Sequence, residues 1–244
     1  MKLIVLLVTA LAGVVSSRKL PDFVHKCKIS DPEIGNCIAE NINNLRSRFA
    51  KGIPELGVPP AEPLLIPKAE LKSPNPDGLR ANFYDIHVYN PSSFEIKKLN
   101  VDPKGNTIDV HVYIPYLHIT AKYEMNGKIL ILQLKGSGPG EVNITNIDSK
   151  VGYKLSQHEK NGKQYYQLER VSQELNYKVT KLGFKNLFEG RDDLTESTNQ
   201  VLNENIDEVM KEFKPVVDDT VKAVVDGIVF RVFDRFSINE LFDN

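Results

Sequence analysis

The side chains of this chain that could do chemistry are two cysteines, five histidines and the adjacent carboxylates of Asp192 and Asp193. Cys27 and Cys37 lie close together, and an even, closely spaced pair in an exported chain is typical of a disulfide. A zinc site is the alternative, but zinc needs four ligands and only His25 lies near the two thiols. We therefore predict a disulfide between Cys27 and Cys37, and no metal site.

No pattern in the sequence assembles a catalytic group. The other histidines lack the close spacing of a metalloprotease helix, and no G-x-S-x-G nucleophile motif is present. The glycine cluster at 136–140 does not open a helix as a phosphate-binding loop does, so we interpret it as a loop. Acidic residues at 192 and 193 suit a helix start, where they offset the helix dipole. The sequence predicts a non-enzymatic protein without metal or cofactor.

Residues 1–17 have the layout of a cleavable signal peptide. Lys2 precedes an apolar run over residues 3–15, and small residues allow cleavage after Ser17. The apolar run is shorter than the roughly 20 residues that span a membrane. A retained N-terminal anchor is the alternative, but no stop-transfer pattern flanks the run. We predict a secreted, extracellular domain over residues 18–244, without stable membrane insertion.

Charge and glycosylation signals bound the choice of partners. The chain carries 31 basic and 32 acidic residues, a balance that gives no electrostatic footprint for nucleic acid. Asn143, Ile144 and Thr145 form an N-glycosylation sequon, which makes Asn143 a candidate glycan site in an exported chain. We expect this sequon to be exposed because it follows the glycine-rich segment at 136–140.

The first element expected after the signal peptide is a helix over residues 30–50, with Ser30 and Glu33 at capping-box spacing. Residues 52–76 are rich in proline, which excludes a helix or a central strand. Aliphatic residues lie between those prolines. We therefore predict an ordered, extended segment that packs on a core, and not a solvated linker.

Residues 79–180 alternate in the manner of antiparallel strands joined by hairpins. The apolar phase over 107–114 flips after Pro115, which predicts a bulge or bend there. Asn126 with Gly127, and Asn161 with Gly162, are strong signals for two-residue hairpin turns. We expect the first turn to lead into a strand over 128–134.

Two helical segments, 194–213 and 216–236, carry apolar stripes and flank Pro215, which we expect to interrupt or kink the helix. Stripes this long need a long apolar partner surface, and the strands supply it. The side chains expected to line the space between them are Val110, Val112, Ile114, Tyr123, Leu130, Leu132, Leu134, Val209, Phe213 and Ile228. Tyr123 or Tyr113 could orient a ligand through its hydroxyl. Periodicity alone favours a dry core, because it shows that a face is buried and not whether the buried space is empty.

Several short blocks follow one another in order along residues 20–242. They are Leu20-Pro21-Asp22-Phe23, Cys27-Lys28, Lys51-Gly52-Ile53-Pro54-Glu55-Leu56, Asn126-Gly127-Lys128, Phe184-Lys185-Asn186-Leu187-Phe188, Leu202-Asn203-Glu204-Asn205 and Ile238-Asn239-Glu240-Leu241-Phe242. In this order they resemble the insect takeout and hemolymph juvenile-hormone-binding protein family, with its circadian-clock-controlled members. The chain departs from that pattern at Gln133, where relatives commonly have proline, and at Ala121, where a glycine is usual.

The resemblance implies an α+β fold in which a strongly curved antiparallel sheet wraps a long C-terminal helix, as a single tubular lipid-binding module. It implies an apolar tunnel that carries a small hydrophobic ligand, such as a terpenoid, juvenile-hormone-like or fatty acyl compound, in hemolymph-like fluid. A role in circadian, feeding or chemosensory physiology would follow. We expect a monomer. The alternative is an extracellular interaction protein with a solid core that acts through its surface.

Overall fold

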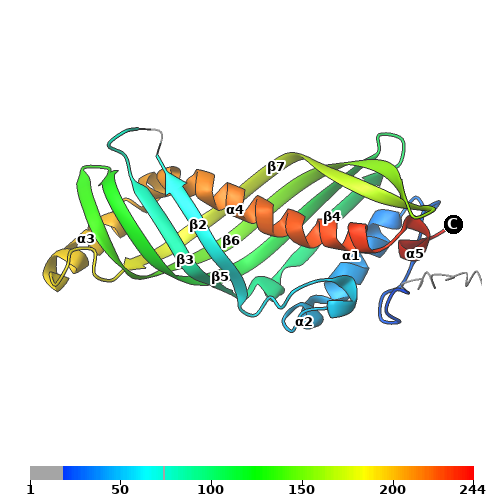
Figure 1. Ribbon diagram of the computed structural model, residues 1–244, viewed down its shortest axis with the longest axis horizontal. Coiled ribbons are helices and arrows are strands. Elements are labelled where there is room, and N and C mark those ends of the chain that lie inside the picture. Colours follow the sequence, from blue (N-terminus) through cyan, green and yellow to red (C-terminus); the bar gives the residue numbers. More distant parts are fainter. Residues whose placement is uncertain (1–18, 74) are drawn as a thin grey trace, which may run out of the picture.

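The computed structural model describes residues 19–73 and 75–244, so the predicted signal peptide lies outside the described residues. Six strands form one antiparallel sheet in the order β2-β3-β5-β6-β7, with β4 also paired to β5. They are β2 (Leu64–Lys72), β3 (Arg80–Tyr89), β4 (Glu95–Asp102), β5 (Thr107–Ile129), β6 (Leu132–Lys160) and β7 (Lys163–Phe184). The long helix α4 (Ile206–Arg235) lies along one face of this sheet (Figure 1). Helix α4 contacts both outer strands, β2 and β7, which shows that the sheet curls around the helix. The predicted fold, a curved antiparallel sheet that wraps a long helix, is confirmed.

Strand β5 is long enough to pair with two strands in succession along one edge. Its residues 107–113 pair with β4, and its residues 118–126 pair with β3. Pro115 lies between the two halves, where neither partner strand has a residue opposite it. The predicted phase flip is confirmed, because Ile114 and Leu117 pack in the same apolar cluster although they are an odd number of residues apart.

The predicted hairpin turn at Asn126 and Gly127 is wrong. Both residues continue β5 in register with β6, and the chain reverses at Leu130 and Ile131. Gly127 serves packing instead, since a Cβ there would lie 2.4 Å from the carbonyl oxygen of Gly78. The turn-like dipeptide therefore reflects a close approach of the β2–β3 connection.

The glycine cluster at 136–140 is part of β6, and its interpretation as a loop is also wrong. A Cβ on Gly136 or Gly138 would lie 2.4 or 2.3 Å from a backbone oxygen of Leu187 or Lys185. Gly136 and Gly138 leave one face of the strand without side chains, so the segment after β7 lies directly on its backbone. Glycines that resemble a loop in sequence thus mark a contact between two chain segments.

The second predicted hairpin is confirmed. β6 ends at Lys160 and β7 begins at Lys163, and these two residues pair across the turn. Asn161 and Gly162 both have positive φ, 53° and 73°, as a type I′ turn requires.

The proline-rich segment contains a short 3-10 helix, η1 (Pro54–Leu56), and then β2 at the edge of the sheet. Pro67 lies within β2 and has no residue paired opposite it in β3. An edge strand tolerates proline because one side of its ladder is empty. The prediction of an ordered, extended segment that is not a central strand is confirmed.

The helices are α1 (Ile34–Asn44), α2 (Arg46–Phe49), α3 (Asp192–Glu204), α4 and α5 (Ile238–Leu241), with a second 3-10 turn, η2 (Pro91–Ser93). The helix predicted over 30–50 is shorter and divided, and the expected cap is absent because Glu33 takes the N-cap position without a side-chain bond. Asp192 and Asp193, expected just before a helix that begins at residue 194, lie in the first turn of α3, which begins two residues earlier.

The C-terminal helix is broken at a different residue from the one predicted. Pro215 lies inside α4, which continues through it, and the break falls at Asn205 between α3 and α4. The side chain of Asn205 donates to the carbonyl oxygen of Val201 at 2.8 Å and so satisfies a group at the end of α3. The helical segment is therefore broken at Asn205 and continues through Pro215, where packing tolerates the loss of one backbone hydrogen bond.

Asparagine side chains attach helices to strand edges. Asn199 and Asn203 of α3 each donate to and accept from the backbone of one residue in β7, at 2.6–2.9 Å. Asn43 of α1 does the same with Ile96 of β4, at 2.9 and 3.2 Å. Each amide pairs with one backbone N–H and one C=O at the edge of a strand, as a neighbouring strand would. Fewer backbone groups at that edge therefore remain unpaired.

Both ends of the described chain meet at one end of the molecule. β1 (Cys27–Lys28) pairs in parallel with β8 (Phe242–Asp243), and the Cys27–Cys37 disulfide ties β1 to α1. α5 begins with a capping box between Ser237 and Glu240. We call this group of elements the terminal clasp.

Four apolar clusters fill the described part of the molecule. The tight core is centred on Leu79, Tyr123, Leu134, Leu187, Leu202 and Val209. The middle cluster consists of Ile144, Ile147, Leu175 and Val179 with side chains of β5 and α4. The hairpin-side cluster contains Val151, Tyr153 and Leu168, and the terminal cluster contains Leu45, Ile53 and Phe236. The first three follow one another along α4.

Candidate functional site

The apolar side of α4 changes in burial along its length. Near its start, Val209 is fully buried and Phe213 nearly so in the tight core. After Phe213, every valine from Val216 to Val232 is only partly buried. Apolar area therefore stays accessible along most of the helix, although that side of the helix packs against the sheet.

The sheet presents an apolar wall to this part of the helix. In the middle cluster, Val217 and Val221 of α4 pack with Ile144, Ile147 and Leu175 of β6 and β7. Ile114 and Leu117 of β5 pair directly across from Ile147 and Ile144, so their side chains lie on the same face. The partly buried valines of α4 thus face an apolar wall on the concave side of the sheet.

A buried polar cluster lies at one end of this region. Asp226 of α4 accepts from the hydroxyl of Tyr153 at 2.8 Å and from Nε and Nη2 of Arg170 at 2.8 and 2.6 Å. Arg170 also donates to Gln173 at 2.8 Å. The side chains of Arg170 and Asp226 are only 4% and 11% exposed. Burial, followed by the bond to Asp226, raises the pKa of Tyr153.

This cluster holds α4 against β6 and β7. All three donors converge on one oxygen of Asp226, Oδ1, so the carboxylate fixes both strands relative to the helix. Removing either charge would leave the other buried without a partner, which is costly. The arrangement fixes the spacing between helix and sheet at one point.

Tyr177 places a hydroxyl beside the middle cluster. Its ring packs against that cluster from β7. Burial, with a smaller effect of the Asp218 charge, raises the pKa of Tyr177 to about 12, so the hydroxyl stays protonated at neutral pH. No hydrogen bond to it is formed within the described residues. It is therefore a free donor next to an accessible apolar surface.

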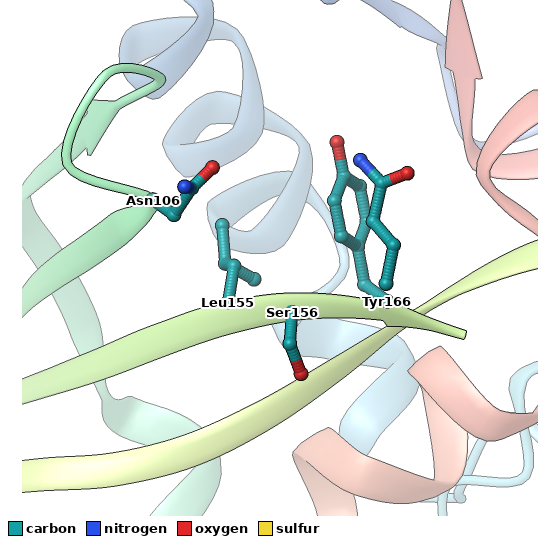
Figure 2. Close-up of a pocket in the computed structure, with 5 residues that line it drawn as sticks. Asn106, Leu155, Ser156 and Tyr166 are labelled. Carbon is teal, nitrogen blue, oxygen red and sulfur yellow. The ribbon is translucent and has the colours of Figure 1, made fainter.

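A cavity of about 220 Å³ lies beside the hairpin-side cluster. Its lining residues are Asn106, Leu155, Ser156, Gln157 and Tyr166. Figure 2 shows Leu155 and Tyr166 projecting from their strands toward the same side, whereas Ser156 points to the other side. Leu155 and Tyr166 also pack on the hairpin-side cluster, so the apolar wall of this cavity belongs to that cluster.

The predicted lining residues fall into two groups. Val110, Val112 and Ile114 lie on β5 and are partly buried, and Ile228 packs on the terminal cluster. In contrast, Tyr123, Leu132, Leu134, Val209 and Phe213 lie in or against the tight core. Leu130 is 38% exposed at the β5–β6 turn, because the turn falls later than predicted. The residues of the first group lie outside the tight core and away from this turn, and they remain candidates for the lining.

The two tyrosines expected to orient a ligand are used elsewhere. The Tyr123 hydroxyl donates to the carbonyl oxygen of Lys185 at 2.7 Å, and burial raises the pKa of Tyr123 to about 12. The Tyr113 hydroxyl donates to Asn146 on the exposed side of the sheet, at 2.9 Å. Tyr177, Arg170 and Asp226 take their place as interior polar groups.

Arg170 was not among the predicted site residues, although the sequence contains a signal for it. Tyr166, Leu168 and Arg170 alternate along β7, so an arginine occupies an inward position of a half-buried strand. Such a charge must find a carboxylate within the core. Asp226, on the α4 segment that carries Val229, was the matching signal.

The histidines and the sequon lie outside this region. His111 Nε2 lies 2.7 Å from Asp148, and His118 Nδ1 lies 2.7 Å from Oδ1 of Asn143. Asn143 lies in a strand and is partly buried, not in a loop. Within residues 19–73 and 75–244, no group of three or more His, Cys, Asp or Glu side chains could hold a metal ion. No helix in the same ranges combines the length and apolar character needed to cross a membrane.

A curled antiparallel sheet around one long helix, with partly buried apolar side chains between them, defines the architecture of this chain. The sequence model of the haemolymph juvenile hormone binding protein family matches residues 3–243. The chain therefore belongs to this family.

Individual relatives agree with the family match. The circadian clock-controlled protein daywake of Drosophila melanogaster is 23% identical over 237 residues, which cover 93% of this chain and 90% of that protein. A Schistocerca gregaria protein whose name refers to beta-carotene binding is 24% identical over 223 residues, or 90% of this chain and 88% of that protein. The crystal structure of Epiphyas postvittana Takeout 1 superposes with a TM-score of 0.76 at 20% identity, covering 91% of this chain and all of that one.

Proposed function

We propose that this protein is a secreted, non-enzymatic carrier of a small hydrophobic ligand, which binds between α4 and the concave side of the sheet. The observation that carries the proposal is the accessible apolar surface on α4 after Phe213, opposite the middle cluster. Val209, at the start of the same helix, is fully buried in the tight core by contrast. Family membership and the name of the Schistocerca relative support a lipophilic ligand.

Burial of apolar area supplies the affinity. At about 25 cal/mol per Å², covering the ligand and the facing valines together yields several kcal/mol. The free Tyr177 hydroxyl would donate to one oxygen of the ligand and so fix its direction along α4. The ligand class that fits is an elongated terpenoid or fatty acyl compound with an oxygen at or near one end.

We propose that residues 18–244 act as one lipid-binding domain, released as a monomer after cleavage at residue 17. Asn143 is the proposed glycan site. Its Oδ1 accepts from Tyr116 and His118, so glycosylation would have to occur before or despite these contacts.

The direct test is native mass spectrometry of the secreted protein, followed by organic extraction. The expected result is a stoichiometric lipophile that leaves on extraction. Competition between this compound and a fluorescent fatty acid would then give its affinity. An empty protein that also ignores fatty-acid and terpenoid probes would contradict the carrier function and favour a protein that acts through its surface.

A pair of substitutions on α4 locates the site. Val221→Trp fills the space at the middle cluster and is expected to reduce probe binding at least about tenfold by occupying the ligand volume. Ala223→Trp adds the same side chain on the exposed side of α4 and serves as the matched control. Equal loss in both variants would show that the ligand does not lie between helix and sheet.

A further inference from the structure

A second cavity lies away from the apolar interior, at the C-terminal end of α4. Its volume is about 300 Å³, and its lining residues are Gly57, Lys160, Arg231, Asp234 and Arg235. They come from three parts of the chain: the residue after η1, the end of β6 and the last turns of α4. A space of this size holds several waters or a hydrated ion, since one water takes about 30 Å³.

The lining of this cavity is strongly cationic. Three cationic side chains against one carboxylate leave two positive charges in excess. Within the described residues, Lys160, Arg231 and Arg235 form no ion pair with any carboxylate. Lys160 instead places its Nζ 5.6 Å from the centre of the Tyr165 ring. The C-terminal dipole of α4 opposes this excess only partly, because it amounts to about half a charge.

Arg235 has an unsatisfied donor at this site. Its Nε is buried and has no hydrogen-bond partner. The rest of the side chain lies beside Gly57, whose φ of 75° is a conformation that glycine adopts readily. A Cβ at residue 57 would lie 3.8 Å from Cδ and from Nη1 of Arg235. The side chain of Arg235 therefore lies close to the backbone at Gly57.

We propose that this cavity binds an oxyanion of the phosphate type. A guanidinium presents several N–H groups in a plane that matches phosphate oxygens. Two arginines of α4 and a lysine of β6 line the space, and a phosphate near neutral pH carries about the charge that the lining leaves in excess. The oxyanion can be free phosphate or the headgroup of an anionic phospholipid. The site is independent of the apolar interior.

The test uses inorganic phosphate as the probe on the secreted protein. Phosphate is titrated at constant ionic strength, and binding is followed by calorimetry and by the Nε–H signals of arginine in NMR spectra. We expect saturable binding, a shift of the Arg235 signal, and at least about a fivefold loss of affinity in Arg231→Gln and in Arg235→Gln. Arg80→Gln, an exposed arginine at the start of β3, is the control and is expected to change affinity less than about twofold.

Vesicles distinguish the two sources of the oxyanion. The protein is sedimented with phosphatidylcholine vesicles that contain or lack phosphatidic acid. Binding that needs phosphatidic acid, is lost in Arg231→Gln and is competed by phosphate identifies a lipid headgroup. Phosphate binding without vesicle binding identifies a soluble oxyanion. No saturable phosphate binding, or equal losses in Arg80→Gln and Arg235→Gln, would overturn the proposal. Arg231 is exposed, so the Arg231→Gln variant should still take up lipophilic probes. A loss of phosphate binding in this variant is therefore distinguishable from a failure of the carrier function.

Discussion

The tight core and the middle cluster share helix α4 and the same sheet but differ in how completely they are filled. Nine of the thirteen buried side chains of the tight core are at most 4% exposed and the other four 6–8%, whereas the four buried side chains of the middle cluster are all 6–7% exposed and their partners on α4 more so. In the tight core, β2, β7, α3 and the segment after β7 surround the start of α4. Among the described residues, the middle cluster is covered only by the sheet on one side and by α4 on the other. The number of chain segments that cover an apolar surface, and not its composition, separates a solid core from a candidate binding region.

The largest expected effect compares matched leucines in the two regions. Leu134→Ala removes a fully buried side chain of the tight core and should lower the free energy of unfolding by about 3–5 kcal/mol. Leu117→Ala, in the middle cluster, should cost about 1–2 kcal/mol because part of its surface is already accessible. Urea denaturation measures both. Equal losses would mean that the two regions are packed alike.

The polar cluster between helix and sheet should be almost as sensitive. Asp226→Ala leaves Arg170 buried without its partner and should cost about 3 kcal/mol. The double variant Arg170→Met, Asp226→Leu removes both charges and should recover most of that loss. Thermal unfolding followed by circular dichroism compares them. If the double variant is less stable than Asp226→Ala, the pair contributes net attraction and the interpretation as a spacing device fails.

Acid should loosen the terminal clasp before it affects the tight core. Burial alone would raise the pKa of Glu240, but hydrogen bonds from Lys163 and Ser237 outweigh it and lower the pKa from 4.5 to about 2. Because the folded pKa lies below the unfolded value, Glu240 stabilises the fold above about pH 4.5, and this contribution of about 2–3 kcal/mol is lost as pH falls to about 2.

The variant Glu240→Gln tests this assignment. It should be less stable than the parent at pH 7, and the difference should shrink between about pH 4.5 and pH 2. Hydrogen exchange of the α5 and β8 amides, compared with those of the tight core, shows whether the loss is local. A constant difference across that pH range would rule out the carboxylate as its source.

The smallest expected effect on stability is at Tyr177. Tyr177→Phe removes a hydroxyl without a protein partner, so unfolding should change by less than about 0.5 kcal/mol. Affinity for an oxygen-bearing lipophile should fall about three- to tenfold, while affinity for a pure hydrocarbon probe stays the same. Tyr123→Phe is the matched control in the tight core. It should lower stability through loss of the bond to Lys185 and leave probe binding unchanged.

The local sequence determined most of the secondary structure and the disulfide. The Asn161 and Gly162 turn, the phase flip around Pro115 and the edge position of the proline-bearing β2 follow from local steric rules. These features depend on φ angles, missing N–H groups and side-chain alternation, which nearby residues set. The order of short family blocks along the chain identified the fold.

Tertiary structure decided the features for which a residue's role depends on a distant segment. Gly127, Gly136 and Gly138 look like turn residues, yet they lie within strands because another backbone passes over them. Asn205, not Pro215, ends a helix because packing along α4 tolerates the lost bond. Periodicity marked Val209 and Val221 alike as buried, but only the number of segments around each shows which one is in a solid core and which one faces accessible space. Burial is a property of the neighbours that the chain brings together, and the residue itself does not encode their number.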